Sequence, residues 1–152
     1  MIEYKFNKMM QHLANRNGVS FENEFVEYKL PAELNHIIQN GIQRELIEQN
    51  VYYKFRDTVF EFFYKDITGN EVSNNKVVFE RSKYDKYTLK KGFSFCHKLS
   101  RILPSACAFD IIMSIDESYV MVSFNMLREG ESWLRDDLEE YKSEAILVMT
   151  CK

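Results

Sequence analysis

The spacing of apolar side chains predicts three or four helices. Apolar residues recur at intervals of three and four over 3–16, 31–49 and 93–103, which is the period of an amphipathic helix. Pro31 suits the first turn of the second of these helices. A fourth helix is predicted over 132–141, where a narrow apolar stripe runs beside acidic residues.

Stretches rich in aromatic and β-branched residues predict the strands of a sheet. The clearest unit is a hairpin, in which 109–115 and 119–126 are joined by a polar tip at 116–118. Residues 68–70 are predicted to form a turn. Because hairpins join antiparallel strands, residues 1–152 are expected to form one α+β domain with a mainly antiparallel sheet and three to four helices. Further strands are predicted at 25–30, 51–55, 58–64, 76–80 and 145–150.

The composition is that of an ordinary folded domain. Hydrophobic residues make up 45% of the chain and charged residues 28%, so order is expected throughout. No run of about 18 apolar residues occurs, and the first residues lack the apolar core of a secretion signal. We therefore expect a cytoplasmic protein without membrane contact, in which Cys96, Cys107 and Cys151 are reduced and mostly buried.

The sequence contains no motif typical of catalysis, cofactor binding or metal binding. Its three histidines are widely separated, and neither a zinc-protease helix motif nor a glycine-rich phosphate loop is present. Cys96 and His97 are neighbours, but adjacent helical residues point about 100° apart and do not form a nucleophile with its base. Cys96 is expected in the core and His97 at the surface. We expect no enzyme activity, no cofactor and no metal.

Charge is distributed unevenly along the chain. Residues 76–101 carry eight Lys or Arg against two acids, whereas residues 129–144 carry seven acids against two bases. Lysines and tyrosines are interleaved within 81–98, an arrangement that can bind single-stranded nucleic acid. A solvated helix face anchored by its tyrosines gives the same pattern, and the net charge of −3 disfavours a nucleic-acid partner.

The acidic region surrounds the only tryptophan of the chain. On the helix predicted over 132–141, Trp133 would lie at the border of the apolar stripe with acidic residues beside it. Two interpretations stay open: the acids simply face water, or the ring and its carboxylates anchor a basic partner. The second interpretation predicts partner contacts by Glu129, Glu131, Trp133, Asp136, Asp137 and Glu140.

The last third of the chain has a recognisable order of segments. The strand-forming run Tyr119-Val120-Met121-Val122-Ser123-Phe124 is followed by Arg128-Glu129-Gly130-Glu131-Ser132-Trp133-Leu134, by Asp136-Asp137-Leu138-Glu139-Glu140-Tyr141 and by a closing strand. This pattern resembles small immunity proteins of bacterial contact-dependent inhibition and related polymorphic toxin systems. The resemblance implies a protein that is made beside a toxin, often a nuclease with a basic active site. Such a protein binds the toxin in the cytoplasm and blocks access to substrate without catalysing a reaction.

Three functions follow as hypotheses. The leading one is an immunity protein that binds and neutralises a cognate bacterial toxin domain, with a nuclease as the expected toxin. The first alternative is a small regulatory or nucleic-acid-binding protein that uses the basic stretch 81–98. The second alternative is an enzyme whose site is assembled from residues scattered along the chain.

Overall fold

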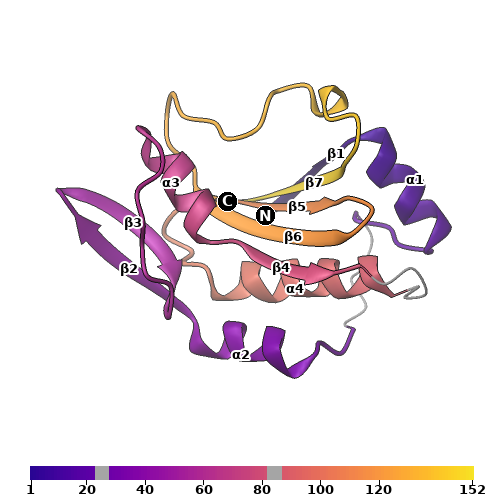
Figure 1. The fold of residues 1–152 in the computed structure, drawn as a ribbon, viewed down its shortest axis with the longest axis horizontal. Helices are drawn as coiled ribbons and strands as arrows, with labels where there is room; N and C mark the ends of the chain where they lie inside the picture. Colours follow the sequence, from indigo (N-terminus) through magenta and orange to yellow (C-terminus); the bar gives the residue numbers. More distant parts are fainter. Residues whose placement is uncertain (23–27, 82–86) are drawn as a thin grey trace.

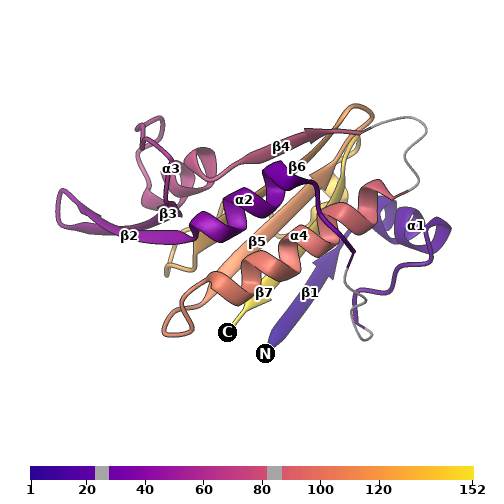
Figure 2. The same cartoon turned by 90° about the horizontal axis from the view of Figure 1, so that it is seen from below.

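Helices and antiparallel strands are interleaved along the chain, as Figures 1 and 2 show. The computed structural model describes residues 1–22, 28–81 and 87–152, and this part of the chain forms four α-helices and seven strands. The predicted α+β class is confirmed. None of the helices in these ranges combines the length and the apolar character that a membrane crossing requires. In chain order the elements are β1 (Ile2–Phe6), α1 (Lys8–Arg16), α2 (Ala32–Asn40), β2 (Ile42–Ile47), β3 (Asn50–Phe55), α3 (Ile67–Asn74), β4 (Val77–Glu80), α4 (Thr88–Ile102), β5 (Phe109–Ile115), β6 (Tyr119–Met126), the 3-10 turn η1 (Leu138–Glu140) and β7 (Ala145–Cys151).

Five strands form the main sheet in the order β1-β7-β5-β6-β4, and every neighbouring pair is antiparallel. The hairpin predicted from 109–115 and 119–126 is confirmed as β5 and β6. The strands predicted at 76–80 and 145–150 are confirmed as β4 and β7. β2 and β3 pair with each other in a separate two-stranded sheet, which projects from the main body as an arm (Figure 1).

One face of the main sheet is apolar and packs against helices. Because side chains alternate between the two faces of a strand, Ile111, Met113 and Phe124 point to the same side and are fully buried. Helix α4 lies across this face with α2 beside it (Figure 2) and contributes Phe95 to the core. A β-carbon at Gly92 would lie 2.6 Å from the sulfur of Met113, so glycine allows α4 to approach the sheet closely.

The opposite face of the sheet mixes apolar and polar side chains. A small apolar cluster at its centre contains Ile112, Ile146 and Val148. The connection between β6 and β7, residues 127–144, passes over this face (Figure 1); we call it the covering segment. Polar positions around the cluster are Asp110, Ser114, Ser123, Asn125 and Thr150. Packed on the cluster from the covering segment are Trp133, Leu134, Leu138 and Tyr141.

The prediction of one helix over 3–16 is wrong, because its first residues form strand β1. Their side chains alternate between half-buried and exposed, and β7 supplies the hydrogen-bonding edge with which they pair. Helix α1 starts only after Asn7, whose side chain accepts a hydrogen bond from the backbone N–H of Met10 at 3.0 Å. Asparagine is a favoured residue at this capping position.

The helix predicted over 31–49 is also too long. Helix α2 ends at Asn40, and Gly41 follows with a φ of 79°, a conformation that favours glycine and ends many helices. The apolar spacing continues through Ile42 and Leu46, but these residues belong to strand β2. Leu46 is largely exposed there, so helical spacing in this stretch does not mark a buried face.

The region around α3 differs from its prediction in both halves. The stretch 58–64, predicted as a strand, is irregular. The backbone of Glu61, Phe63 and Tyr64 in it bonds to side chains of α3. Residues 68–70, predicted as a turn, lie inside α3. Asp66 caps this helix, because its Oδ1 accepts a hydrogen bond from the backbone N–H of Gly69 at 3.0 Å.

Two further elements differ from their predicted bounds. Helix α4 begins at Thr88, before the predicted start at residue 93. Part of the strand predicted at 25–30 lies outside the described residues, and the remaining positions 28–30 are not in a strand.

Candidate functional site

The covering segment carries all six residues predicted to contact a partner, and it is not helical. Within it only the short turn η1 is regular, so the helix predicted over 132–141 is wrong. Ser132 Oγ donates to a backbone oxygen two residues further on at 2.8 Å, and Asp137 Oδ1 accepts from the N–H of Glu139 at 3.0 Å. Short polar side chains that bond to nearby backbone in this way compete with helical hydrogen bonds.

The course of the covering segment is fixed by hydrogen bonds to other elements. Its contacts reach β1, the start of α1 and the first turn of α3. Both side chains and backbone of the segment take part, and the contacts are spread along its length. The bonded atoms are Glu131 Oε1 with Thr68 N (2.9 Å), Asp136 O with Lys5 Nζ, Glu139 Oε2 with Lys8 N (2.9 Å) and Glu144 O with Asn7 Nδ2 (2.8 Å).

Trp133 lies half-buried between the covering segment and the sheet. Its ring packs on the apolar cluster of the sheet face. It also meets the ring of Tyr64 edge-on, with centroids 5.2 Å apart and planes at 83°. The helical geometry that was expected to place Asp136, Asp137 and Glu140 around Trp133 does not exist. Trp133 instead connects the covering segment to the residues that precede α3.

Four of the predicted acids, Glu129, Asp136, Asp137 and Glu140, are exposed, and Glu131 is half-buried. Glu131 and Asp137 each accept a hydrogen bond from a backbone N–H of this protein, so they hold the segment in place. Glu140 forms a surface ion pair with an arginine of the same segment at 3.2 Å. Among the described residues, Glu129, Asp136 and Glu140 are thus the predicted acids whose side chains do not fix the backbone.

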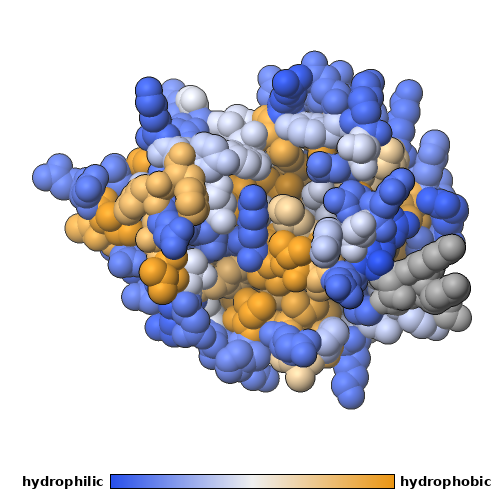
Figure 3. All heavy atoms as spheres, viewed as in Figure 1, coloured by the Kyte–Doolittle hydropathy of each residue, from blue (hydrophilic) through white to orange (hydrophobic). Residues whose placement is uncertain are grey.

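Cavities lie beside and beneath the covering segment. A hollow of about 710 Å³ lies at the end of the sheet, between α1, the tip of the β5–β6 hairpin near Glu117, and the end of the covering segment near Lys142. The cavity directly beneath Trp133 has a volume of about 320 Å³ and an apolar floor that includes Ile112 and Ile146. In Figure 3 apolar surface is visible near the middle of the molecule, below the covering segment.

A polar row crosses the sheet beside a further cavity of about 200 Å³. Asp110 is paired in register with Thr150 on one side and Asn125 on the other, and Thr150 Oγ1 donates to Asp110 Oδ1 at 2.6 Å. Burial raises the pKa of Asp110 above its ordinary value. Asn125 Oδ1 is buried and has no hydrogen-bond partner within the described ranges. Asp110 therefore stays protonated to a higher pH than a carboxyl group exposed to water.

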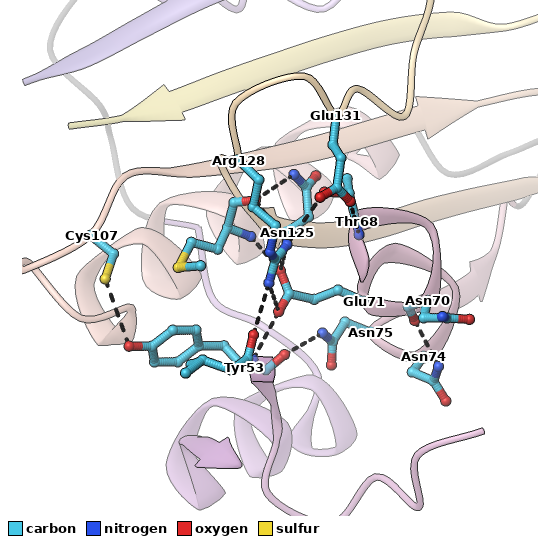
Figure 4. Close-up of polar contacts among 12 residues, drawn as sticks. Tyr53, Thr68, Asn70, Glu71, Asn74, Asn75, Cys107, Asn125, Arg128 and Glu131 are labelled. Atoms are coloured by element: carbon cyan, nitrogen blue, oxygen red, sulfur yellow. Dashed lines mark hydrogen bonds and ion pairs between the residues drawn. The ribbon is translucent and has the colours of Figure 1, made fainter. Parts of the chain in front are cut away.

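A fully buried carboxylate, Glu71 of α3, forms an ion pair with Arg128 (Figure 4). The two guanidinium nitrogens lie 2.9 and 3.0 Å from the two carboxylate oxygens. Glu71 also accepts the backbone N–H groups of Tyr53 and Met126, and Arg128 donates to the carbonyl of Val51 at 3.1 Å. Because four donors occupy this carboxylate, Glu71 joins the arm, α3 and β6 and has a structural role.

The amide side chain of Asn75, the residue directly after α3, extends this junction along strand β3. Asn75 Oδ1 accepts the N–H of Phe55 at 3.1 Å, and Asn75 Nδ2 donates to the carbonyl of Tyr53 at 2.8 Å. Together with Glu71, Asn75 therefore makes the contacts that a neighbouring strand would otherwise make along this edge. Asn75 lies close to Glu71 in Figure 4.

Two asparagines within α3 bind the irregular stretch 59–64, which we call the aromatic loop. Asn70 Oδ1 accepts the N–H groups of Phe63 and Tyr64 at 2.8 and 2.9 Å. Asn74 bonds to both the N–H and the carbonyl of Glu61, each at 2.7 Å. Sequence reasoning missed these roles because 58–64 was interpreted as a strand and 68–70 as a turn. The signal that could have found them is the spacing of four between the two asparagines, which places them on one side of a helix.

The cysteines and His97 are parts of the packed structure. Cys96 is fully buried, as predicted, and burial raises its pKa; Cys107 and Cys151 are half-buried free thiols. The prediction that His97 lies at the surface is wrong, because α4 buries it against Phe93, with ring centroids 4.6 Å apart. Burial, together with Arg101, lowers the pKa of His97. In the described part of the chain, no three His, Cys, Asp or Glu side chains gather as a metal site would require.

The basic stretch 81–98 is only partly described, since residues 82–86 lie outside the described residues. In the part that is described, Tyr87 stacks on Tyr28 with centroids 5.4 Å apart. Lys90 Nζ lies 5.7 Å from the centroid of the Tyr87 ring. Tyr87 therefore anchors the start of α4 to the preceding chain rather than presenting a free stacking surface.

Comparison with known proteins assigns the chain to a family. The model of the Uncharacterized protein PM0498 family matches residues 5–152, so the chain belongs to this family. No match was found among curated proteins or among solved structures.

Proposed function

We propose that this member of the family is an immunity protein, which binds a cognate bacterial toxin domain through the covering segment and blocks its active site. The observation that carries the proposal is an acidic surface on a segment whose backbone is held in place by hydrogen bonds. Glu129, Asp136 and Glu140 are exposed on a segment that hydrogen bonds attach to three other elements. A surface that is ordered before binding loses less conformational entropy when a partner docks.

A basic partner suits this surface for a physical reason. Opposite potentials accelerate the encounter of two proteins and discriminate against wrong partners. Proteins that bind nucleic acid carry basic surfaces, because phosphates dominate that interaction. A nuclease domain is therefore the toxin that we propose, and the cytoplasm, where free thiols stay reduced, is where we propose that the two meet.

The proposal assigns no reaction to the chain itself. Support comes from how its buried reactive groups are used: four donors occupy the Glu71 carboxylate, and burial disfavours the reactive thiolate of Cys96. Hydrolytic or transferase turnover by the purified protein, lost on one histidine or carboxylate substitution, would overturn this part of the proposal.

The direct test uses the protein encoded beside this chain. For an immunity protein, the neighbouring gene should encode a large secreted protein whose variable C-terminal domain is the toxin. We expect that domain to co-purify with this chain and to lose its toxicity when the two are expressed together. The affinity should fall steeply as salt is raised, because charge dominates the encounter. Absence of a complex would refute the proposal.

Charge reversal locates the interface. The variant Asp136→Lys with Glu140→Lys should bind about tenfold or more weakly at low salt, and its affinity should depend less on salt. A matched control is Glu22→Lys with Glu48→Lys, which reverses two exposed acids outside the covering segment. Equal affinity and equal salt dependence of the two variants would show that the covering segment is only a solvated face.

A further inference from the structure

Several large apolar side chains of the aromatic loop are exposed to solvent. Val59, Phe62, Phe63 and Tyr64 are between 47% and 83% exposed. Figure 3 shows apolar side chains at the surface along this part of the molecule, beside α3. Scattered exposed apolar residues are normal, but a contiguous group of this kind marks an interaction surface.

The protein holds this loop in a defined shape. Asn70 and Asn74 bond to its backbone at Glu61, Phe63 and Tyr64, as described above. From the arm, Tyr52 packs against the rings of Phe60 and Phe62, with centroids 4.6 and 6.1 Å apart. Asn70 is buried, so its bonds are protected from water. The buried Asn70 and the half-buried Asn74 thus hold the loop in a shape that exposes its apolar side chains to solvent.

The loop is continuous with the acidic surface of the covering segment. Tyr64 contacts Trp133 edge-on, and Glu131 bonds to the first turn of α3 directly after the loop. In the chain the apolar group adjoins two exposed acids, Glu61 and Asp66, and one exposed base, Lys65. Glu129 is a further exposed acid, on the covering segment. An apolar centre with a charged border is the usual anatomy of a specific protein interface.

We infer that the aromatic loop is the apolar centre of the interface with the toxin domain, and that the covering segment is its acidic border. This inference rests on the proposed function. The occupant is a protein surface with an apolar patch bordered by lysine or arginine side chains. The acidic border disfavours an anionic membrane surface, which attracts basic segments, and a second copy of this chain, which would bring the same negative charges together.

The test replaces the two exposed phenylalanines. Phe62→Ser with Phe63→Ser should weaken binding to the C-terminal domain encoded beside this chain by about tenfold or more, mainly through faster dissociation. The matched control is Leu46→Ser with Val78→Ser, which removes two apolar side chains that are 64% and 50% exposed elsewhere. Thermal unfolding of both variants should stay close to that of the unmodified protein, because the replaced side chains are exposed.

The outcomes separate the inference from the proposed function. If the complex forms, responds to Asp136→Lys with Glu140→Lys, and is insensitive to the phenylalanine variant, the inference fails and the proposed function stands. If no complex forms with the unmodified protein, both fail. Binding to phosphatidylglycerol vesicles, or dimerisation in sedimentation, that depends on Phe62 and Phe63 would assign the loop to a membrane or to a second copy and would overturn the inference.

Discussion

The substitution Glu71→Gln tests whether the buried junction determines the stability of the fold. In the protein the carboxylate of Glu71 is fully buried and accepts four hydrogen bonds, two of them from Arg128. Glutamine has nearly the same shape but carries no charge and replaces one acceptor oxygen by a donor. Arg128 would then remain largely buried without its counter-charge, and one donor would face another donor.

The expected cost follows from these contacts. Removing one partner of a buried ion pair costs about 3–5 kcal/mol, against a total stability of about 5–15 kcal/mol for a typical domain. For a domain of about this length each kcal/mol lowers Tm by about 2–4 °C. Glu71→Gln should therefore lower Tm by about 6–20 °C. Thermal unfolding followed by circular dichroism, with urea titration for the free energy, measures both quantities.

Two comparisons make this prediction refutable. Glu140→Gln breaks an exposed ion pair that has a single contact of 3.2 Å and should cost no more than about 1 kcal/mol. Replacing both Glu71 and Arg128 by methionine should not restore stability, because the N–H groups of Tyr53 and Met126 lose their acceptor at about 1–3 kcal/mol each. A loss of less than 1 kcal/mol in Glu71→Gln, or full recovery in the double variant, would refute the reasoning.

Two further predictions concern titration and are measured by urea unfolding as a function of pH. Burial raises the pKa of Asp110, so the contribution of its protonated carboxyl group to stability is lost as the pH rises through the raised pKa. Asp110→Asn should therefore be more stable than the unmodified protein near pH 7 and should lose this advantage near pH 3. A variant that is not more stable at any pH would contradict the raised pKa of Asp110. Burial and Arg101 lower the pKa of His97, so its contribution is present above the unfolded value of about 6.5 and is lost as the pH falls through the lowered pKa. His97→Gln should flatten the fall in stability between about pH 7 and pH 5, and an unchanged slope would exclude the imidazole as its source.

Elements whose information is local could be predicted from the sequence. The β5–β6 hairpin is specified by alternation on both sides of a polar tip, and its partners are adjacent in the chain. Strand β1 could not be predicted in the same way, because its pairing partner β7 lies at the other end of the sequence. Its short run of apolar residues fits helical and extended spacing equally well.

The residues of the candidate site could be predicted from the sequence, but the backbone conformation that arranges them could not. The acids and Trp133 do lie together on one segment, and most of the acids are exposed, as charge and hydropathy indicated. Their arrangement was wrong because Ser132 and Asp137 bond to nearby backbone, a competition that the apolar spacing does not reveal. The aromatic loop escaped prediction for a related reason: aromatic residues favour strands, but side chains of α3 took the backbone bonds that a strand would have used.

The order of strands has a consequence for how the protein is made. β7 lies between β1 and β5 in the sheet, so β1 pairs with a strand that is synthesised about 140 residues later. Synthesis proceeds at about 5–20 residues per second, and β1 therefore waits on the order of ten seconds for its partner. After β5 has been synthesised and before β7 follows, the edges of β1 and β5 are both unpaired, and unpaired edges can join other chains. Closure of the sheet is thus a long-range step, which slows folding and leaves nascent chains vulnerable to aggregation until β7 has been synthesised.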